Sequence, residues 1–255
     1  MRRKSPNPPR TSVSSRPSYE LPALDAQFLL GDSMRGVRFL LEYAKAEELL
    51  RLANIRSTIV VFGSARTKPS HRWYKAAREF GRIASLRGGA CNPDDKERNN
   101  VIATGGGPGT MEAANRGAAD ADAPSIGFNI QLPHEQEPNR YSTPDLTFQF
   151  HYFAMRKMHL AMRANGLVVF PGGFGTLDEL FELLTLRQTG KIDALPVVLF
   201  DRDYWTRLIN FDALVEAEMI ERDDLNLFSY ADDPEEVWTK LVAGGLQAKG
   251  PAKLR

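Results

Sequence analysis

The sequence is poor in two features that would point away from a reducing cytoplasm. It contains one cysteine, Cys91, which cannot form a disulfide within the chain and has no metal-ligand pattern around it. It also lacks any uninterrupted apolar run close to the roughly 20 residues that cross a bilayer. We therefore expect a cytoplasmic protein that spans no membrane and holds no metal ion.

An excess of charge of either sign is also missing. Lysine and arginine number 33 against 32 aspartate and glutamate residues, a formal net charge of +1. Such a balance provides no general attraction to nucleic acid or to a membrane surface, so the expected partners are small molecules or proteins. With 255 residues, of which 42% are hydrophobic, the chain is long enough for one α/β core.

The two ends of the chain differ in composition from the rest. Residues 1–22 are basic, rich in proline and serine, and free of acids until Glu20, which predicts a disordered tail. A transit peptide is the alternative, but four prolines interrupt the amphipathic helix that it would need. Residues 246–255 are expected to be loose. Between the tails we predict a single domain over residues 23–245, with an extra helix at residues 33–53.

Apolar runs alternate with helical patterns along that domain. Continuous apolar runs are typical of strands in a parallel sheet that helices cover on both faces. We therefore predict an α/β fold with a doubly wound parallel sheet of six to seven strands. The strands are expected at residues 57–62, 100–104, 125–130, 146–150, 167–170, 194–200 and, as a short piece, 225–230. The helices are expected at residues 74–86, 152–165, 204–219 and 233–243 and after residues 110 and 176.

Parallel strands bring the loops that follow them to one edge of the sheet, where ligands bind. The loops concerned are residues 63–66, 104–110, 131–145 and 171–176. The first turn of the helix that starts near Tyr152 belongs to the same edge. We expect any functional site to lie there.

The densest chemical pattern is in residues 168–180 (VVFPGGFGTLDEL). A buried strand stops at Pro171, and Gly172, Gly173 and Gly175 let the backbone turn and approach a ligand without Cβ atoms in the way. Unpaired N–H groups and the positive end of the helix dipole then favour an anion, most often a phosphate, at the start of the next helix. That helix is expected to pack on the core through Leu177, Leu180, Phe181 and Leu184.

A purely structural alternative exists for part of this pattern. Thr176 and Glu179 have the spacing of a capping box, in which the hydroxyl caps the third helical N–H and the carboxylate reaches back. Capping accounts for these two residues but not for the three glycines and the proline directly before them. The anion site is therefore favoured.

The other glycine-rich segment, residues 104–110, departs from the common nucleotide motifs. It misses the last glycine of the dinucleotide fingerprint, and the next strand ends in Asn129 and Ile130 rather than in an acid that holds a ribose hydroxyl. Neither glycine loop contains the Gly-Lys-Ser or Gly-Lys-Thr of a P-loop. A long dinucleotide and a triphosphate are both disfavoured, and a mononucleotide remains.

Two motifs carry a resemblance to a known family. Residues 171–179 (PGGFGTLDE) are similar to the PGGxGTxxE signature of the LOG ("lonely guy") family of cytokinin-activating phosphoribohydrolases, and residues 155–158 (MRKM) to its Arg-Lys helix. Residues 104–117 and 132–136 resemble the longer bacterial branch, and the similarity covers about residues 57–228. The resemblance implies a Rossmann-like homodimer, or a higher homo-oligomer. Such an enzyme hydrolyses the N-glycosidic bond of a nucleoside 5′-monophosphate to free base and ribose 5-phosphate, without a cofactor.

The resemblance also implies roles for single residues. The catalytic pair is Arg156 and Glu179. The phosphate loop is Gly172, Gly173, Phe174, Gly175 and Thr176. Beyond what the resemblance implies, substrate binding is also expected at Met155, Lys157, Ser64, Gly106 and Gly107, the alternative for Met155 being a core or subunit contact. Many relatives carry the label lysine decarboxylase, but nothing in this sequence resembles a pyridoxal phosphate lysine site.

The chemistry of the reaction supports the pair independently. Cleavage of a ribosyl C–N bond builds positive charge on the sugar, which a fixed carboxylate such as Glu179 stabilises. Glu179 is also suited to accept ribose hydroxyls or to activate water. Arg156 is expected to orient that carboxylate or to contact the leaving group, the alternative being a solvated helix charge. We interpret His134 as a surface residue and Glu112 as a favourable acid in a first helical turn.

The sequence does not determine which base the substrate nucleotide carries. The predicted substrate is AMP or an N6-substituted adenine nucleotide. A broader purine or pyrimidine 5′-nucleotide nucleosidase is one alternative, and a nucleotide-binding protein without turnover is another. The presence of both Arg156 and Glu179 argues against the latter.

Overall fold

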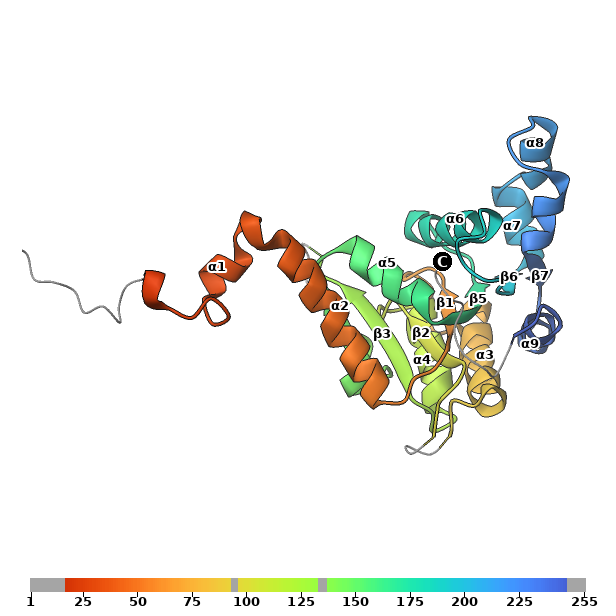
Figure 1. The fold of residues 1–255 in the computed structure, drawn as a ribbon. Helices are drawn as coiled ribbons and strands as arrows, with labels where there is room; N and C mark the ends of the chain where they lie inside the picture. Colours follow the sequence, from red (N-terminus) through yellow and green to blue (C-terminus); the bar gives the residue numbers. More distant parts are fainter. Residues whose placement is uncertain (1–16, 93–95, 133–136, 247–255) are drawn as a thin grey trace, which may run out of the picture. The chain divides into compact units, whose positions relative to one another are not determined.

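The computed structural model describes residues 17–92, 96–132 and 137–246 (Figure 1). Contacts within the chain define two compact units, Met1–Ala44 and Lys45–Arg255, and the boundary falls within helix α2, Arg35–Leu52. The described part of the first unit contains the short helices η2 (Pro17–Tyr19), α1 (Ala26–Leu30) and η3 (Asp32–Met34). Most of the two tails that the sequence predicts to be loose lies outside the described residues.

The second unit is built on one seven-stranded sheet. All adjacent strands are parallel, in the order β4-β3-β2-β1-β5-β6-β7, which confirms the predicted doubly wound sheet. The order reverses between β1 and β5, so the loops after these two strands leave the sheet in opposite directions. The strands are β1 (Thr58–Phe62), β2 (Val101–Thr104), β3 (Ser125–Ile130), β4 (Thr147–Phe150), β5 (Ala164–Val169), β6 (Val197–Phe200) and β7 (Ser229–Ala231).

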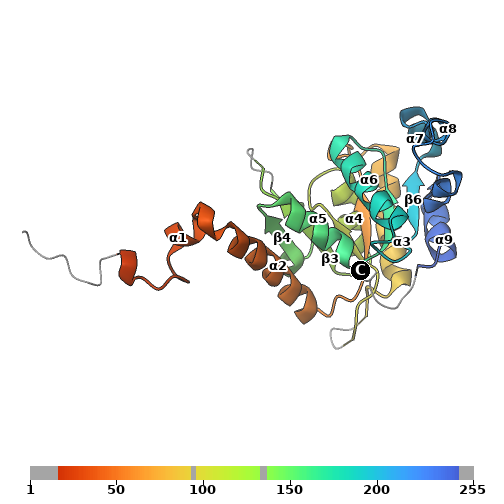
Figure 2. The same ribbon diagram turned by 45° about the horizontal axis from the view of Figure 1, so that its top comes forward.

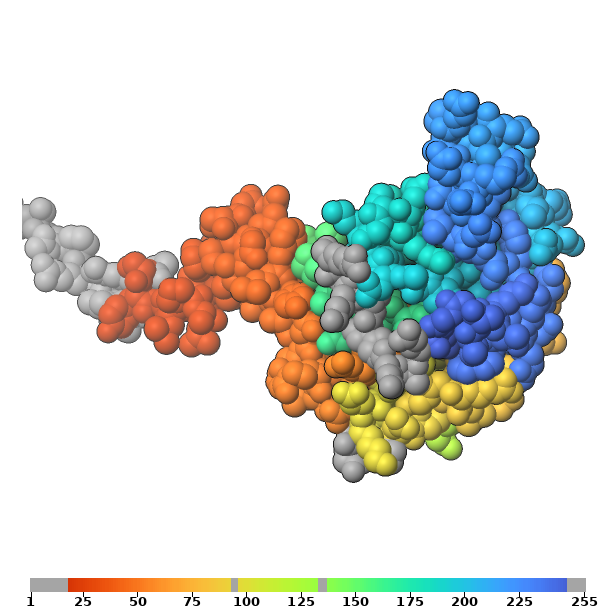
Figure 3. All heavy atoms as spheres, turned by 45° about the vertical axis from the view of Figure 1, so that its right-hand side comes forward, coloured from red at the N-terminus to blue at the C-terminus, as the bar shows by residue number. Residues whose placement is uncertain are grey.

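Helices cover both faces of the sheet. On one face α3 contacts α4 and α9, and the surfaces of α3 (yellow) and α9 (dark blue) lie side by side in Figure 3. Over the other face lie α5 and α6, which are in front of the sheet in Figure 2. The helices are α3 (Arg72–Gly88), α4 (Thr110–Ala119), α5 (Phe153–Met162), α6 (Phe174–Gln188), α7 (Arg202–Leu208), α8 (Phe211–Glu216) and α9 (Pro234–Ala243), with short 3₁₀ turns η4 (Pro144–Leu146) and η5 (Arg222–Leu227).

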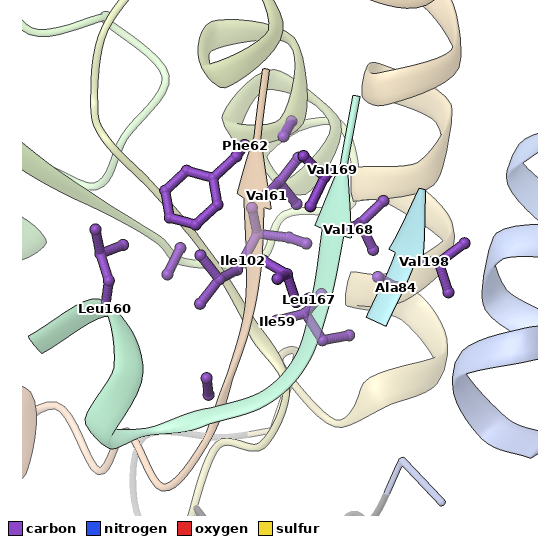
Figure 4. Close-up of a cluster of buried hydrophobic side chains, with 14 of the residues drawn as sticks. Ile59, Val61, Phe62, Ala84, Ile102, Leu160, Leu167, Val168, Val169 and Val198 are labelled. Carbon is purple, nitrogen blue, oxygen red and sulfur yellow. The ribbon is translucent and has the colours of Figure 1, made fainter. Parts of the chain in front are cut away.

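The core lies along the central strands, where every residue of β1 and β5 is buried. Figure 4 shows Ile59 and Val61 of β1 beside Val168 of β5 and Val198 of β6. Burial on both faces explains why these strands appear in the sequence as continuous apolar runs rather than as alternating patterns. The helices α3 and α4 pack closely as well, since a Cβ at Gly117 would lie 1.9 Å from the Arg78 carbonyl oxygen.

The strand expected at 225–230 is only Ser229–Ala231 and follows the 3₁₀ turn η5, and the strand expected at 194–200 starts at Val197. Two predicted helices also have wrong boundaries. The helix expected at 152–165 ends at Met162, and β5 starts at Ala164, because the Asn165 side chain is satisfied inside the sheet by donating to Asn100 Oδ1 at 2.8 Å. The helix expected at 204–219 is two helices, α7 and α8, and the Asn210 side chain caps the second by accepting from Ala213 N at 3.1 Å. In both cases an asparagine stands at the boundary between two elements. Its polar side chain gives no apolar pattern from which the boundary could be predicted.

No helix in the described part of the chain has both the length and the apolar character that a bilayer crossing requires. The longest, α2, has 18 residues and carries charged side chains along its length. Among the same residues, no cluster of three or more histidine, cysteine, aspartate or glutamate side chains has the arrangement of a metal site.

Candidate active site

The loops after β1 and β5 meet at the carboxyl edge of the sheet, where the strand order reverses. Ser64 N donates to the Pro171 carbonyl at 3.0 Å, so the main-chain pairing of the two strands continues beyond their ends. Thr110 N donates to the Ser64 carbonyl at 3.0 Å, which attaches the second glycine-rich loop to the first. Ser64 is thus held between both glycine-rich segments, as a parallel sheet predicts for loops of one edge.

A cavity of about 700 Å³ lies at this edge. Several of the residues predicted from the sequence line it, namely Ser64, Arg156, Glu179 and the loop Gly172, Gly173, Phe174, Gly175 and Thr176. Its lining includes other side chains that the sequence analysis did not assign, among them Arg66, Met111, Tyr204 and Leu208. The size is within the range of small-molecule sites.

Arg156 and Glu179 form an ion pair inside this cavity. Arg156 Nη2 donates to Glu179 Oε1 at 3.0 Å, and the two side chains are 14% and 4% exposed. The alternative of a solvated helix charge at Arg156 is therefore wrong. Arg156 Nε is also buried and has no hydrogen-bond partner among the described residues. An orphaned buried donor of this kind calls for a reason such as a ligand, because burial without a partner costs free energy.

The environment of Glu179 makes the carboxyl group harder to ionise than a glutamate in water. Burial raises the pKa of Glu179 above its ordinary value, and the attraction of Arg156 and Lys157 offsets only part of this effect. A carboxyl group with a raised pKa inside a cavity is a candidate for proton transfer. The pair therefore has both a fixed geometry and the electrostatic setting of a reactive group.

The capping-box alternative does not hold. Helix α6 begins at Phe174 with Gly173 at its N-cap, and no side chain caps it. Thr176 is already the third helical residue, and Glu179 points to Arg156 instead of reaching back to the helix start. The main-chain N–H groups of Gly173, Phe174 and Gly175 consequently have no acceptor among the described residues.

The glycines of this loop serve two different purposes. A Cβ at Gly172 would lie 2.1 Å from Thr176 Oγ1, so glycine is required there for the loop to close over the threonine. At Gly173 and Gly175 a Cβ would meet nothing within 4 Å. Packing of the protein gives no reason for glycine at these two positions, whereas a ligand close to the backbone would.

Four predicted binding residues lie outside the cavity lining. Lys157 Nζ forms ion pairs with Asp178 at 2.9 Å and with Glu182, along a separate groove. Met155 is half-buried against the core. Gly106 and Gly107 are buried, and their carbonyls accept hydrogen bonds from Asn139 N at 2.8 Å and Asn139 Nδ2 at 3.2 Å. The second glycine-rich loop therefore faces the protein more than the cavity.

Some smaller expectations have mixed outcomes. Phe181 of α6 is 39% exposed, so its predicted core position is wrong, and Leu183 is buried in that helix instead. Glu112 lies in the first turn of α4 as predicted and accepts from the Tyr74 hydroxyl at 2.7 Å. His134 and most of the segment 132–136 lie outside the described residues.

Tyr204 is the clearest functional candidate that sequence reasoning missed. Its hydroxyl donates to the Gly172 carbonyl at 2.7 Å, and its side chain lines the cavity. A signal existed, because Tyr204 follows the end of β6 by four residues and so belongs to the same edge of the sheet as the glycine loop.

Comparison with known proteins identifies the class. A protein-family model described as "Possible lysine decarboxylase" matches residues 111–241, more than half of the chain. A rice protein (Oryza sativa subsp. japonica) named as a probable cytokinin riboside 5′-monophosphate phosphoribohydrolase is 30% identical over 146 residues, 56% of this chain and 62% of the relative. An Arabidopsis thaliana protein named as a phosphoribohydrolase of the same kind is 30% identical over 198 residues, 76% of this chain and 85% of the relative.

The chain therefore belongs to the LOG family, the family of these phosphoribohydrolases, whose model carries the lysine decarboxylase description. The match spans less than two thirds of the rice relative's length. Among solved structures, the molybdenum cofactor binding protein from the phototrophic bacterium Rippkaea orientalis has a TM-score of 0.51 at 21% identity, covering 74% of this chain and 97% of that one. That likeness supports the fold alone.

The two glycines at the start of α6 should respond differently to an added methyl group. We expect Gly172→Ala to lower the free energy of unfolding by about 1–3 kcal/mol, because the new Cβ overlaps Thr176. Gly173→Ala should change it by less than about 0.5 kcal/mol, because its Cβ enters open space. Urea denaturation of both variants measures the difference, and equal destabilisation would contradict the assignment of open space at Gly173.

Proposed function

We propose that this protein hydrolyses the N-glycosidic bond of a nucleoside 5′-monophosphate, either AMP or an N6-substituted adenine nucleotide. The products are the free base and ribose 5-phosphate. The observation that carries the proposal is the buried Arg156–Glu179 pair in a cavity that is also lined by the glycine loop, whose first N–H groups have no acceptor among the described residues. Membership of the LOG family supports it.

The phosphate is assigned to the start of α6. Gly173, Phe174 and Gly175 offer N–H groups without acceptors, and the helix dipole adds positive potential there. The charged side chains of the lining are also positive on balance. They are two arginines, Arg66 and Arg156, and one carboxylate, Glu179. Among the described residues none pairs with the Arg66 guanidinium, which leaves it available to an anion.

Glu179 is assigned to the sugar. As the bond between C1′ and the base nitrogen breaks, positive charge develops on the ribose, and the carboxylate stabilises it. A water molecule supplies the oxygen that bonds to C1′, and its proton passes through Glu179 to the departing base nitrogen. Arg156 orients the carboxylate through the 3.0 Å hydrogen bond.

The lysine decarboxylase description does not fit the cavity. A pyridoxal phosphate enzyme needs a lysine amine at its reacting centre. No lysine is among the described residues that line the cavity, and Lys157, the nearest candidate in sequence, pairs with Asp178 and Glu182 outside it. A nucleotide substrate agrees better with the residues present.

Glu179→Gln separates the proposed enzyme from a binding protein. We expect the wild-type protein to release ribose 5-phosphate from AMP or its N6-isopentenyl analogue, and the variant to lose about 10²–10⁴-fold in turnover with little change in AMP affinity. A colorimetric assay of reducing sugar and calorimetric titration measure the two quantities. Glu235→Gln on α9, which pairs with Arg87 outside the cavity lining, is the matched control and should remain active.

Three outcomes of that experiment argue otherwise. Release from pyrimidine and purine nucleotides alike would favour the broader nucleosidase. Binding of AMP without release from any nucleotide would leave the non-catalytic nucleotide-binding protein. Equal loss of affinity and turnover in the Gln variant would show that Glu179 maintains the fold of the site rather than its chemistry.

The pH profile should reflect the raised pKa of Glu179. The ionised carboxylate is the active form, so activity falls as the pH drops through the pKa of Glu179 in the folded protein. Because burial raises that pKa, we expect the acid limb of kcat/KM to lie above pH 4.5, the ordinary value for glutamate. Circular dichroism over the same range checks that the fold persists. An acid limb at or below pH 4.5 would contradict this role.

We also propose that the protein acts as a cytoplasmic homodimer. The outer face of α6 exposes Phe174 (93%) and Phe181 (39%) beside a groove of about 630 Å³. The same groove carries Lys157 together with Asp178 and Glu182, so two copies related by a two-fold axis could match charges of opposite sign. Exposed aromatic side chains in this setting are typical of contact surfaces.

A charge placed on this face should separate the subunits. We expect Phe181→Glu to sediment as a monomer where the wild-type protein sediments as a dimer, because the carboxylate would be buried without a partner. Leu86→Glu, at a more exposed apolar position on α3 (55% against 39% for Phe181), is the control and should remain dimeric. A wild-type monomer in sedimentation velocity would refute the proposal.

A further inference from the structure

The hydrogen bond from Tyr204 to the glycine loop fixes one particular peptide plane. The Gly172 carbonyl, which accepts from the Tyr204 hydroxyl at 2.7 Å, belongs to the same peptide unit as the Gly173 N–H. In a planar trans peptide the C=O and N–H bonds point in opposite directions. A carbonyl held toward Tyr204 therefore turns the Gly173 N–H the other way, and that N–H has no acceptor among the described residues.

Tyr204 is itself held in place by a buried carboxylate. Asp201 is 4% exposed and caps α7 by accepting from Tyr204 N at 3.2 Å. Trp73 Nε1 donates to the same carboxylate at 2.7 Å, and the Arg72 guanidinium also pairs with it. The Trp73 ring meets the Tyr204 ring edge-on, with centroids 5.6 Å apart. Three donors thus satisfy Asp201, and the aromatic contact limits the movement of the tyrosine.

Asp201 adopts an unfavourable backbone conformation, which its side-chain contacts must stabilise. Asp201 has φ 75° and ψ 82°, in the left-handed region of backbone angles that residues other than glycine rarely adopt. Aspartate tolerates this region better than most residues, but the conformation still costs free energy. The hydrogen bonds of its carboxylate to the start of α3 and to α7 offset that cost.

We propose that Tyr204 is a positioning residue for phosphate recognition. Its hydroxyl orients the Gly172–Gly173 peptide so that the Gly173 N–H is presented to the cavity. Asp201 and Trp73 hold the tyrosine side chain in the position that makes this hydrogen bond. The assignment of the anion as a substrate phosphate depends on the proposed function. The orientation of the loop by Tyr204 does not, so the two can be tested apart.

Tyr204→Phe removes the hydroxyl and retains the ring that packs on Trp73. We expect binding of AMP and of ribose 5-phosphate to weaken about 10-fold, the usual effect of one lost hydrogen bond near a charged ligand. Adenosine, which lacks the phosphate, should lose less than about 2-fold in affinity. Isothermal titration calorimetry measures all three. Tyr230→Phe on β7, outside the cavity lining, is the matched control and should bind all three as the wild-type protein does.

Hydrogen exchange of the ligand-free protein provides a readout without nucleotide. In Tyr204→Phe the amides of residues 172–176 should exchange several-fold faster than in the wild-type protein, whereas those of β1 and β5 should be unchanged. Unchanged exchange in the loop, or equal weakening of AMP and adenosine, would overturn the inference. Kcat at saturating AMP should fall less than kcat/KM, which a general loss of structure would not produce.

Failure of the proposed function gives a different pattern. A wild-type protein that binds AMP and ribose 5-phosphate but releases no base refutes the hydrolase. The affinities of the Tyr204→Phe variant still decide whether Tyr204 positions the loop. A wild-type protein that binds neither ligand refutes both, because no phosphate would then be recognised at this loop.

Discussion

The parallel pairing of β1 with β5 is the constraint on which the candidate site depends. Crossovers in parallel sheets are right-handed, so the connection after β1 and the connection after β5 pass over opposite faces. The hydrogen bond from Ser64 N to the Pro171 carbonyl holds the first residues of the two loops side by side. Beyond these residues the loops diverge, which leaves room between them. The cavity, the start of α6 and the Arg156–Glu179 pair all lie around this point.

The ion pair is better understood as a functional feature than as a source of stability. Burying two opposite charges costs desolvation that their attraction often fails to recover, and an apolar pair of similar size would commonly serve the fold as well. The raised pKa of Glu179 reflects this cost directly, since burial outweighs the attraction of two neighbouring cations. In the function proposed here, the carboxylate is retained beside the unpartnered amides for the chemistry of the cavity.

Much of this could be predicted from sequence because the signals are local. Continuous apolar runs predict the buried strands, and one edge of a parallel sheet gathers the loops after them, which placed Ser64 beside Gly172 without coordinates. The signals failed where tertiary contacts decide. Whether a side chain faces the cavity is set by packing between distant segments, so Lys157 turned to Asp178 and the second glycine loop turned to Asn139. The contact of Tyr204 with the Gly172 carbonyl joins positions 32 residues apart and has no local signature.

Every amino acid except proline supplies the same backbone N–H, so donors built from main chain cannot be deleted by exchanging side chains. In the functions proposed here, Phe174 contributes an amide to phosphate binding while its ring, 93% exposed in the single chain, belongs to the face that contacts a second copy. Phosphate binding through this amide therefore places no demand on the side chain of residue 174, which in the proposed dimer serves the contact between subunits. A substitution there would alter the contact between subunits while the amide that binds the anion is retained.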